Sequence, residues 1–244
     1  MEYEYALDSC VGSRERNEDR IVCFTRDGNT VAVVADGMGG HGDGDLAAEA
    51  VVNTIKECFS AYPVVNEANV TAIMEAANRS VLALQTEGKD MRSTVVSLFL
   101  SEEATIVAHA GDSRFYCLDS YRTTYRTKDH SVTQLEVEMG KIKEKDRKNS
   151  PDRNRVLKSM GNPECKVTVH TLSSTENSGK GYLLCTDGFW EHYDDKTIRR
   201  MMRKSKCNSE IWLRSMMEKV ASEATEKQDN YSAIALIKRR VKDE

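Results

Sequence analysis

The sequence has few of the features that mark membrane-bound, secreted or proline-rich proteins. Its 244 residues include only 3 prolines, and no apolar run reaches the ~18 residues of a membrane-spanning helix. The first nine residues, MEYEYALDS, lack the basic and apolar stretches of a secretory signal. We therefore expect a cytoplasmic protein with no membrane partner.

Cysteine is present, but without a recognisable pattern. The 7 cysteines include no Cys-x-x-Cys pair, which argues against both a disulfide framework and a zinc site. Cys23, Cys117 and Cys185 lie in apolar, strand-like segments, where a free thiol behaves as a small hydrophobe. Buried, inert cysteines in a reducing cytosol are the simplest interpretation.

A surplus of one charge is also missing. Lys and Arg number 35 against 39 Asp and Glu, for a net charge of -4, so the composition gives no sign of a nucleic-acid partner or a basic groove. The 39% of hydrophobic residues fits a folded chain rather than a disordered one. No repeat, linker or proline-rich hinge divides the sequence. We therefore expect a single domain over residues 1–244, and a monomer.

Strand patterns and helix patterns come in blocks. Apolar runs predict strands at residues 2–9, 20–25, 30–35, 93–100, 104–110, 114–118, 121–126, 166–171, 181–186 and 231–237. Apolar residues at helical spacing predict helices at 46–58, 66–85, 194–204 and 209–225, with Leu46 and Ile211 on the inward faces of the first and last. Such blocks indicate an α+β fold with antiparallel sheets.

One segment, 138–155, differs from the rest in composition. Eleven of its eighteen residues are charged, so it is expected to be a solvated surface excursion and not core. Ser131 and Gln134 have the form of a capping box, which predicts a short helix before this segment that ends at Gly140.

Acidic residues recur at the ends of the apolar strands. Asp36, Asp112 and Asp187 each adjoin a glycine after an apolar run, while Asp229 and the group Asn17-Glu18-Asp19 precede strands. A single Asp-Gly pair is most often a turn. If the strands lie side by side, however, the carboxylates gather and raise one another's pKa unless cations neutralise them. An all-oxygen cluster selects hard ions such as Mg²⁺ or Mn²⁺.

A phosphoester is the substrate class that such a cluster favours. Two cations ~3.5–4 Å apart clamp an in-line phosphoryl displacement and lower the pKa of bound water to ~7. Arg14, four residues before Glu18, could hold phosphate oxygens through its planar guanidinium. Without the neighbouring acids, Arg14 would be interpreted as an ordinary surface arginine.

A dinucleotide-binding site is an alternative that the sequence itself raises. The segment from Gly37 to Gly42 satisfies G-x-G-x-x-G between a strand and a helix. Asp36, Asp43 and Asp45 would, however, meet a pyrophosphate with like charge. A second helix follows the first, where a nucleotide-binding unit has a strand. An oxidoreductase is therefore a minor alternative.

Taken together, the motifs resemble the type 2C, metal-dependent protein serine/threonine phosphatase family, especially its bacterial members. Eight blocks match in the family's order, namely Arg14-x-x-Asn17-Glu18-Asp19, ADGMGGHGDG from Ala35, Ser93-Thr94, Gly111-Asp112-Ser113-Arg114, TKDHSV from Thr127, SPDRNRVLKSMG from Ser150, LLCTDGFWE from Leu183 and Asp229-Asn230-Tyr231-Ser232. The resemblance implies a four-layer αββα sandwich, with two central antiparallel β-sheets flanked by helix pairs and metals at one end.

The resemblance also implies the main catalytic roles. Asp36, Asp187 and Asp229 would be the catalytic acids. Asp36 would bridge two Mn²⁺ or Mg²⁺ ions, and the Gly37 carbonyl would bind one of them. Asp187 and Asp229 would hold the other ion, and Arg14 would bind the substrate phosphate.

Further acids are implied at the edge of this site. Glu18 and Asp19 would act through bound water. Asp112, Asp187 and Glu191 would frame a weaker third metal site, although the family more often has Asp at the last position. For Asp112 a second interpretation stays open, that of a buried acid hydrogen-bonded in its own turn.

The resemblance also has implications for how the substrate is selected and how its leaving group is protonated. Residues 138–163 correspond to the family's flap, which helps select substrates. Met38 stands where eukaryotic relatives carry a histidine proposed as the general acid, so the group that protonates the leaving alcohol is unassigned. His41 is better interpreted as fixing the glycine loop, and Asp129 and His130 as bracing the start of the short helix.

The expected function is hydrolysis of phosphoserine and phosphothreonine in proteins by a metal-activated water, opposing a serine/threonine kinase. One alternative is a non-catalytic binding module on the same fold, which the intact set of acids argues against. Another is a different two-metal phosphoesterase, such as a nuclease, which would need a basic groove for its polyanionic substrate.

Overall fold

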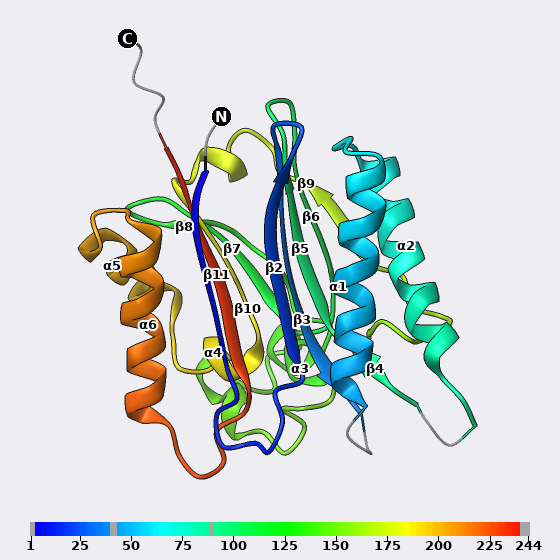
Figure 1. Ribbon diagram of the computed structural model, residues 1–244. Coiled ribbons are helices and arrows are strands. Elements are labelled where there is room, and N and C mark those ends of the chain that lie inside the picture. Colours follow the sequence, from blue (N-terminus) through cyan, green and yellow to red (C-terminus); the bar gives the residue numbers. More distant parts are fainter. Residues whose placement is uncertain (1–2, 40–42, 88–89, 240–244) are drawn as a thin grey trace.

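Two antiparallel sheets pack face to face, and each carries a pair of helices on its outer side (Figure 1). The computed structural model describes residues 3–39, 43–87 and 90–239. His41 and its two glycine neighbours therefore lie outside the described residues, as does the start of the first predicted strand. None of the described helices is long and apolar enough to cross a membrane.

The first sheet has the strand order β1-β11-β10-β7-β8. Its strands are β1 (Tyr3–Cys10), β7 (Arg114–Leu118), β8 (Thr123–Arg126), β10 (Gly181–Cys185) and β11 (Tyr231–Lys238). Helices α5 (Asp195–Lys204) and α6 (Ser209–Glu223) cover its outer face. The strand that is last in the sequence thus lies inside the sheet, next to the first.

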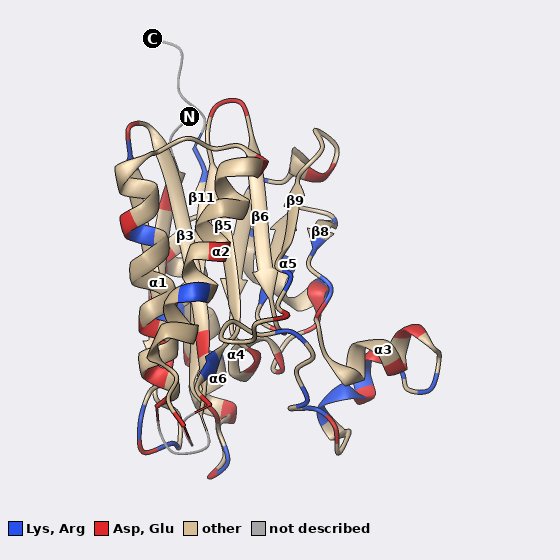
Figure 2. Cartoon of the chain, turned by 90° about the vertical axis from the view of Figure 1, so that its right-hand side faces the viewer, with Lys and Arg blue, Asp and Glu red and all other residues tan. Residues whose placement is uncertain are grey.

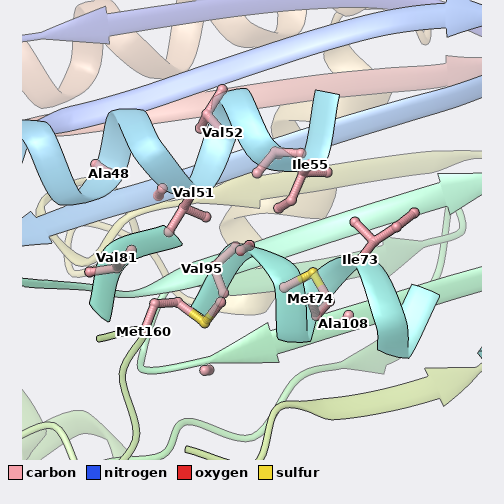
Figure 3. Packing of buried hydrophobic residues seen from close by; sticks show 14 of the residues in the cluster. Ala48, Val51, Val52, Ile55, Ile73, Met74, Val81, Val95, Ala108 and Met160 are labelled. Carbon is pink, nitrogen blue, oxygen red and sulfur yellow. The ribbon is translucent and has the colours of Figure 1, made fainter. Parts of the chain in front are cut away.

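The second sheet has the order β2-β3-β5-β6-β9, with a short β4 paired to β3. Its strands are β2 (Asp19–Arg26), β3 (Asn29–Met38), β4 (Arg92–Ser93), β5 (Val95–Leu100), β6 (Thr105–Ala110) and β9 (Thr168–Thr171). Helices α1 (Gly44–Ala61) and α2 (Glu67–Leu84) cover it, and Figure 3 shows their apolar side chains meeting those of the sheet.

Strand alternation distributes the apolar residues among three buried layers. In β3, Val31 and Val33 face the helices, whereas Ala32 and Val34 face the other sheet. Because successive side chains point to opposite faces, a strand buried on both sides reads as a continuous apolar run. This accounts for the uninterrupted VAVVA of β3, which holds Asp36 at its end.

The predicted elements are present, but two inward-facing residues were assigned wrongly. Leu46 in α1 is 46% exposed and Ile211 in α6 is 48% exposed. Each lies five residues before a buried core residue, Val51 and Met216 respectively. At 3.6 residues per turn, five residues rotate a side chain by about 140°, so both residues point away from the sheets.

Four short elements complete the chain, and they are α3 (Val132–Glu138), η1 (Glu144–Asn149), η2 (Glu176–Ser178) and α4 (Asp187–Trp190). Ser131 caps α3 as predicted, because its side chain accepts a hydrogen bond from the Gln134 N–H at 3.3 Å. The Gln134 side chain bonds to Glu138 instead of returning to Ser131. Figure 2 shows α3 and the segment after it projecting beyond the sheets.

Candidate metal and phosphate site

The second sheet supplies two neighbouring acids. The register of β2 and β3 pairs Asp19 directly with Asp36. The backbone of Asp36 is fixed on both sides, since its N–H donates to Thr94 Oγ1 at 3.1 Å and its carbonyl accepts from Ser93 Oγ at 3.0 Å. The strand end therefore presents the Asp36 carboxylate from a rigid position.

The first sheet supplies Asp187 and Asp229. Asp187 opens α4 two residues after β10, and Asp229 precedes β11 by two residues. A Cβ on Gly188 would lie 2.2 Å from the Asn230 carbonyl oxygen. Only glycine permits this close approach of α4 to the start of β11, and so the two acids come from adjoining backbone segments.

The two sheets are joined at this end. Asn230 Oδ1 accepts a hydrogen bond from the Glu18 N–H at 2.8 Å, and the Asn230 side chain donates to the Val11 carbonyl at 2.7 Å. Ser232 Oγ donates to Asp19 Oδ2 at 2.6 Å. The C-terminal strand thus holds the segment that carries Glu18 and Asp19 in place.

Electrostatics show how close these acids are to one another. Burial, and then the charges of Asp19, Asp187, Asp112 and Asp229, raise the pKa of Asp36 well above its ordinary value. Burial, followed by the charges of Asp112, Asp229, Glu191 and Asp19, does the same to the pKa of Asp187. Acids from both sheets therefore repel one another in a buried space, where a cation would relieve the repulsion.

The donor set fits a hard divalent cation. Asp19 Oδ1 is buried with no hydrogen-bond partner in the described part of the chain, while its Oδ2 accepts from Thr186 Oγ1 at 3.1 Å. Burial raises the pKa of Asp19 to about 7. A buried carboxylate oxygen without a partner is costly unless a ligand satisfies it, and an all-oxygen site suits Mg²⁺ or Mn²⁺.

The acids are not arranged as a closed coordination shell. Within residues 3–39, 43–87 and 90–239, no three His, Cys, Asp or Glu side chains are already placed to hold one ion. The mutual pKa effects and this spacing are compatible, because like charges separate until a cation neutralises them. The backbone of both sheets keeps the acids within electrostatic range of one another.

Arg14 lies beside the cluster, on Asp229. Its Nε and Nη2 donate to the two carboxylate oxygens of Asp229 at 2.9 and 2.8 Å. The Arg14 side chain is 57% exposed. An arginine predicted to hold phosphate is thus found at the acid cluster, engaged with one of the predicted metal ligands.

Glu18 and Gly37 lie at the start of α1. The Gly44 N–H donates to the Glu18 carboxylate, and burial raises the pKa of Glu18. A Cβ on Gly37 would lie 2.1 Å from the Gly44 carbonyl oxygen. Glycine at position 37 therefore allows the helix start to approach the end of β3, next to Asp36.

Asp112 and Glu191 lie within electrostatic range of Asp187. Burial, with the charge of Asp129, raises the pKa of Asp112 to about 7, and burial raises that of Glu191. Gly111 has φ +109, and a Cβ there would lie 2.6 Å from Thr94 Cβ. The turn that positions Asp112 thus requires glycine, and the charges of Asp112 and Glu191 both contribute to the raised pKa of Asp187.

A buried ion network next to the cluster was not foreseen. Asp129 accepts from Arg114 Nε and Nη2 at 2.9 Å each, and from Arg147 as well. The Arg114 guanidinium lies 3.4 Å from the ring centre of Trp190, whose Nε1 donates to the Asp112 carbonyl at 2.9 Å. The network therefore extends to the turn that carries Asp112.

Arg147 corrects the prediction that segment 138–155 is solvated throughout. Its side chain is only 4% exposed, although it comes from the charged excursion. Burial alone would raise the pKa of Asp129, but the charges of Arg114 and Arg147 outweigh it and hold that pKa below its ordinary value. Arg147 lies inward because Asp129 and the Gln134 side chain accept its hydrogen bonds. No local sequence pattern marks this partnership.

His130 is also fixed in this region. Its Nδ1 accepts from the Gly111 N–H at 3.3 Å, its Nε2 is 3.1 Å from Thr168 Oγ1, and its ring stacks on His109 at 4.5 Å between centres. Burial lowers the pKa of His130 to about 3. The neutral ring braces the turn before Asp112 rather than the capped end of α3.

A cavity of about 460 Å³ opens over the acids. Asp187, Asp229 and Glu191 line one side, and Lys148 and Arg153 from the charged excursion line the other. A substrate group that reaches the acids would therefore also meet cations of the excursion.

The fold and this site define a class of protein. An αββα sandwich with buried carboxylates from both sheets at one end, an arginine beside them and a cavity above them is typical of metal-dependent phosphoprotein phosphatases. The family model described as protein phosphatase 2C matches residues 8–228. The chain belongs to this family, as its motifs predicted.

Known relatives agree with this assignment. The chain is 27% identical over 206 residues to the serine/threonine phosphatase stp of Listeria monocytogenes serotype 4b (strain F2365). The aligned region covers 81% of each protein. It superposes on serine/threonine phosphatase Stp1 from Staphylococcus aureus with a TM-score of 0.87 at 24% identity, over 98% of this chain and 96% of that one. The predicted four-layer fold is thereby confirmed.

A second similar structure bears on the metals. The catalytic domain of serine threonine protein phosphatase PstP, solved in complex with 2 manganese ions, matches with a TM-score of 0.76 at 24% identity, over 96% of this chain and 97% of that one. This chain is therefore a phosphoprotein phosphatase of a metal-dependent family.

Proposed function

We propose that the chain hydrolyses phosphoserine and phosphothreonine in proteins, and that Asp36, Asp187 and Asp229 hold the two cations the reaction needs. The observation that carries the proposal is the set of buried and half-buried carboxylates from both sheets, whose charges raise the pKa values of Asp36 and Asp187. The similarity of the chain to proteins named serine/threonine phosphatase supports phosphoserine and phosphothreonine as the substrate groups. Mn²⁺ and Mg²⁺ are the ions that an all-oxygen donor set favours.

The remaining residues have supporting roles in this proposal. The Gly37 carbonyl completes the shell at Asp36, Glu18 and Asp19 act through water, and Asp112 with Glu191 offers a third site. When bound, the cations supply a polarised phosphoryl group and a nucleophilic water at neutral pH.

Arg14 has two successive partners in the proposal. Its two donors now engage Asp229, and the same planar pair matches two phosphate oxygens. Because the side chain is largely exposed, it can turn from the carboxylate to an incoming phosphate. That exchange would free Asp229 for a cation in the step that positions the substrate.

The wider biological assignment is also a proposal. We treat residues 1–244 as one phosphatase domain, with 138–163 as a flap that faces the substrate. Its projection beyond the sheets (Figure 2) and the lysine and arginine that it places on the cavity support this view. A monomeric cytoplasmic enzyme that opposes a serine/threonine kinase is the setting we infer.

Release of phosphate from p-nitrophenyl phosphate, and from phosphothreonine and phosphotyrosine peptides, tests the proposal. We expect activity with Mn²⁺ that is lost in EDTA and restored by added metal, and a preference for phosphothreonine over phosphotyrosine. Asp229→Asn should be nearly inactive, whereas Asp27→Asn, which changes an exposed acid in the turn between β2 and β3, should behave like wild type. A protein that binds phosphopeptides without turning them over would instead be a binding module.

A further inference from the structure

A second cavity, of about 770 Å³, lies between η1 of the charged excursion and α5. It shares Lys148, Glu191 and His192 with the cavity over the acids. The two cavities therefore adjoin, and we call them together the groove, with one end at the acid cluster and the other at α5.

The α5 end of this groove is basic. Lys and Arg contribute nine of its lining residues, and Asp and Glu contribute four. The composition of the chain, with a net charge of -4, gave no sign of a basic groove, and that expectation is wrong here. No local sequence pattern predicts this groove, because its cations come from η1 and α5, two segments that are far apart in the sequence.

The acids of the groove are largely engaged with the protein itself. Glu144 lies 3.2 Å from Arg126, and Asp195 lies 3.5 Å from the same guanidinium group. Asp194 caps α5 by accepting a hydrogen bond from the Thr197 N–H at 2.6 Å. Asp194 also lies within electrostatic range of Lys196 and Arg200, but with nine cations and four acids the groove keeps an excess of positive charge.

Four cations of the groove are available to a ligand. Lys145, Lys148, Lys196 and Arg200 are exposed and form no ion pair with any residue in the described ranges. Two of them belong to the excursion and two to α5, so they face the groove from both walls. An anionic chain laid between the walls would contact both pairs.

The aromatic residues of the groove do not offer a stacking surface. Trp190 is 8% exposed, and the Arg114 guanidinium covers its ring at 3.4 Å. Tyr193 packs on Phe189 and donates its hydroxyl to the Met216 carbonyl at 2.6 Å. Single-stranded nucleic acids bind through basic grooves with free aromatic faces, which this groove lacks among the residues described.

We propose that the groove binds an acidic segment of the phosphoprotein substrate, next to the phosphorylated residue. The inference rests on the proposed function, because it needs the phosphorylated residue at the acid cluster. Asp and Glu near the phosphorylation site would then meet the cations of η1 and α5 while the phosphate enters the neighbouring cavity. Complementary charge of this kind mainly selects partners and speeds their association.

A pair of phosphothreonine peptides tests the inference. One carries four Asp or Glu residues beside the phosphothreonine, the other four Lys residues, with the charged block placed on each side in turn. We expect wild type to prefer the acidic peptide by about tenfold in kcat/KM, as a few exposed charge pairs would give. The preference should shrink in 0.5 M salt. The Debye length is already about 10 Å at roughly 0.1 M and is shorter at higher salt, so interactions between exposed charges are screened.

The variant Lys196→Glu/Arg200→Glu should lose or invert this preference. Both side chains are exposed, whereas the buried residues of α5 are Ile198 and Met202, so the helix should still fold, which circular dichroism can check. Lys145→Glu/Lys148→Glu repeats the test from the other wall. Lys56→Glu, an exposed lysine on α1, is the matched control and should keep the wild-type preference.

Hydrolysis of p-nitrophenyl phosphate, which has no flanking residues, separates the two hypotheses. If wild type with Mn²⁺ does not hydrolyse it, the proposed function fails. If wild type hydrolyses it but shows equal kcat/KM for both peptides, or if the α5 variant keeps the preference, the groove inference alone is overturned. Inhibition by a single-stranded oligonucleotide at lower concentration than by the unphosphorylated acidic peptide would also overturn it, in favour of a nucleic-acid groove.

Discussion

Asp129 is buried and Asp36 is half-buried at a strand end, and their surroundings are opposite. Asp129 is surrounded by Arg114 and Arg147, which hold its pKa below the ordinary value despite burial. Asp36 is surrounded by other acids, and burial together with their charges raises its pKa. Asp129 is thus neutralised by arginines, whereas the strongest charges on Asp36 among the described residues are those of other acids.

The contrast separates structural charge from charge that awaits a ligand. A buried ion pair with both partners present fixes a conformation, and losing one partner is strongly destabilising. A buried group of like charges costs stability on its own and becomes favourable only when a cation binds. Trp190 connects the two regions, because it packs on Arg114 and donates to the Asp112 carbonyl.

The largest effect is expected for Asp187→Asn. Loss of one carboxylate from the acid cluster should lower kcat/KM by about 10³-fold, while the unfolding temperature in EDTA should rise because repulsion among the acids is reduced. Activity assays and thermal unfolding of the same sample measure both. If the variant is less stable than wild type in EDTA, the acids do not repel one another as the contrast requires.

For Asp129→Asn we expect a loss of stability, in contrast to the gain expected for Asp187→Asn in EDTA. Two buried arginines would lose their shared counter-ion, so the free energy of unfolding should fall by about 3 kcal/mol. Urea denaturation measures this loss. Asp152→Asn, whose aspartate pairs with the exposed Arg155 at 2.9 Å, is the control and should change stability by less than about 1 kcal/mol. Equal losses in the two variants would remove the distinction between Asp129 and a surface acid.

A third test uses pH. Asp19 and Asp112 have pKa values raised to about 7, mainly by burial, whereas the unfolded chain releases these protons near pH 4. The protonated acids stabilise the folded state fully below about pH 4, and this stabilisation is lost as pH rises to 7. In EDTA, the free energy of unfolding should therefore fall between pH 5 and pH 7.5, by on the order of 2 kcal/mol.

Saturating Mn²⁺ should abolish this slope, because a cation favours the ionised acids. Urea denaturation at several pH values with and without metal makes the comparison. A slope that is the same in both conditions would mean that these acids do not contribute to the metal site.

The smallest effect is expected for Trp190→Phe. Phenylalanine keeps an aromatic ring under Arg114 but cannot donate to the Asp112 carbonyl, so the free energy of unfolding should fall by about 1 kcal/mol. A change in the metal concentration needed for half-maximal activity would show that the indole also positions Asp112. A variant identical to wild type in both respects would show that the two regions are independent.

The sequence predicted most of the fold because its signals are local. Alternating and continuous apolar runs locate the strands, and the glycines at positions 37 and 188 mark two close approaches that the structure contains. The acid-glycine pairs also predicted that carboxylates from distant strands would gather, and in the structure the charges of such carboxylates raise the pKa values of Asp36 and Asp187. The motif order predicted the family.

What the sequence did not reveal depends on distant partners. The burial of Arg147 follows from Asp129, 18 residues away, and the basic groove follows from two segments that meet only in the folded chain. The inward faces assigned to Leu46 and Ile211 failed for another reason. Each lies about one and a half helical turns before a buried residue, and a pattern that requires only an apolar residue in each turn accepts it although its side chain points away from the core.

The position of β11 has a consequence for the timing of synthesis. This strand lies between β1 and β10, and the residues at its start contact the segment that carries Glu18 and Asp19, more than 200 residues earlier. A nascent chain on the ribosome would expose β1 and the first acids long before their partners are translated. Dephosphorylation therefore cannot begin during translation of the earlier strands, and until β11 emerges the edges of β1 and β10 are open to chaperones.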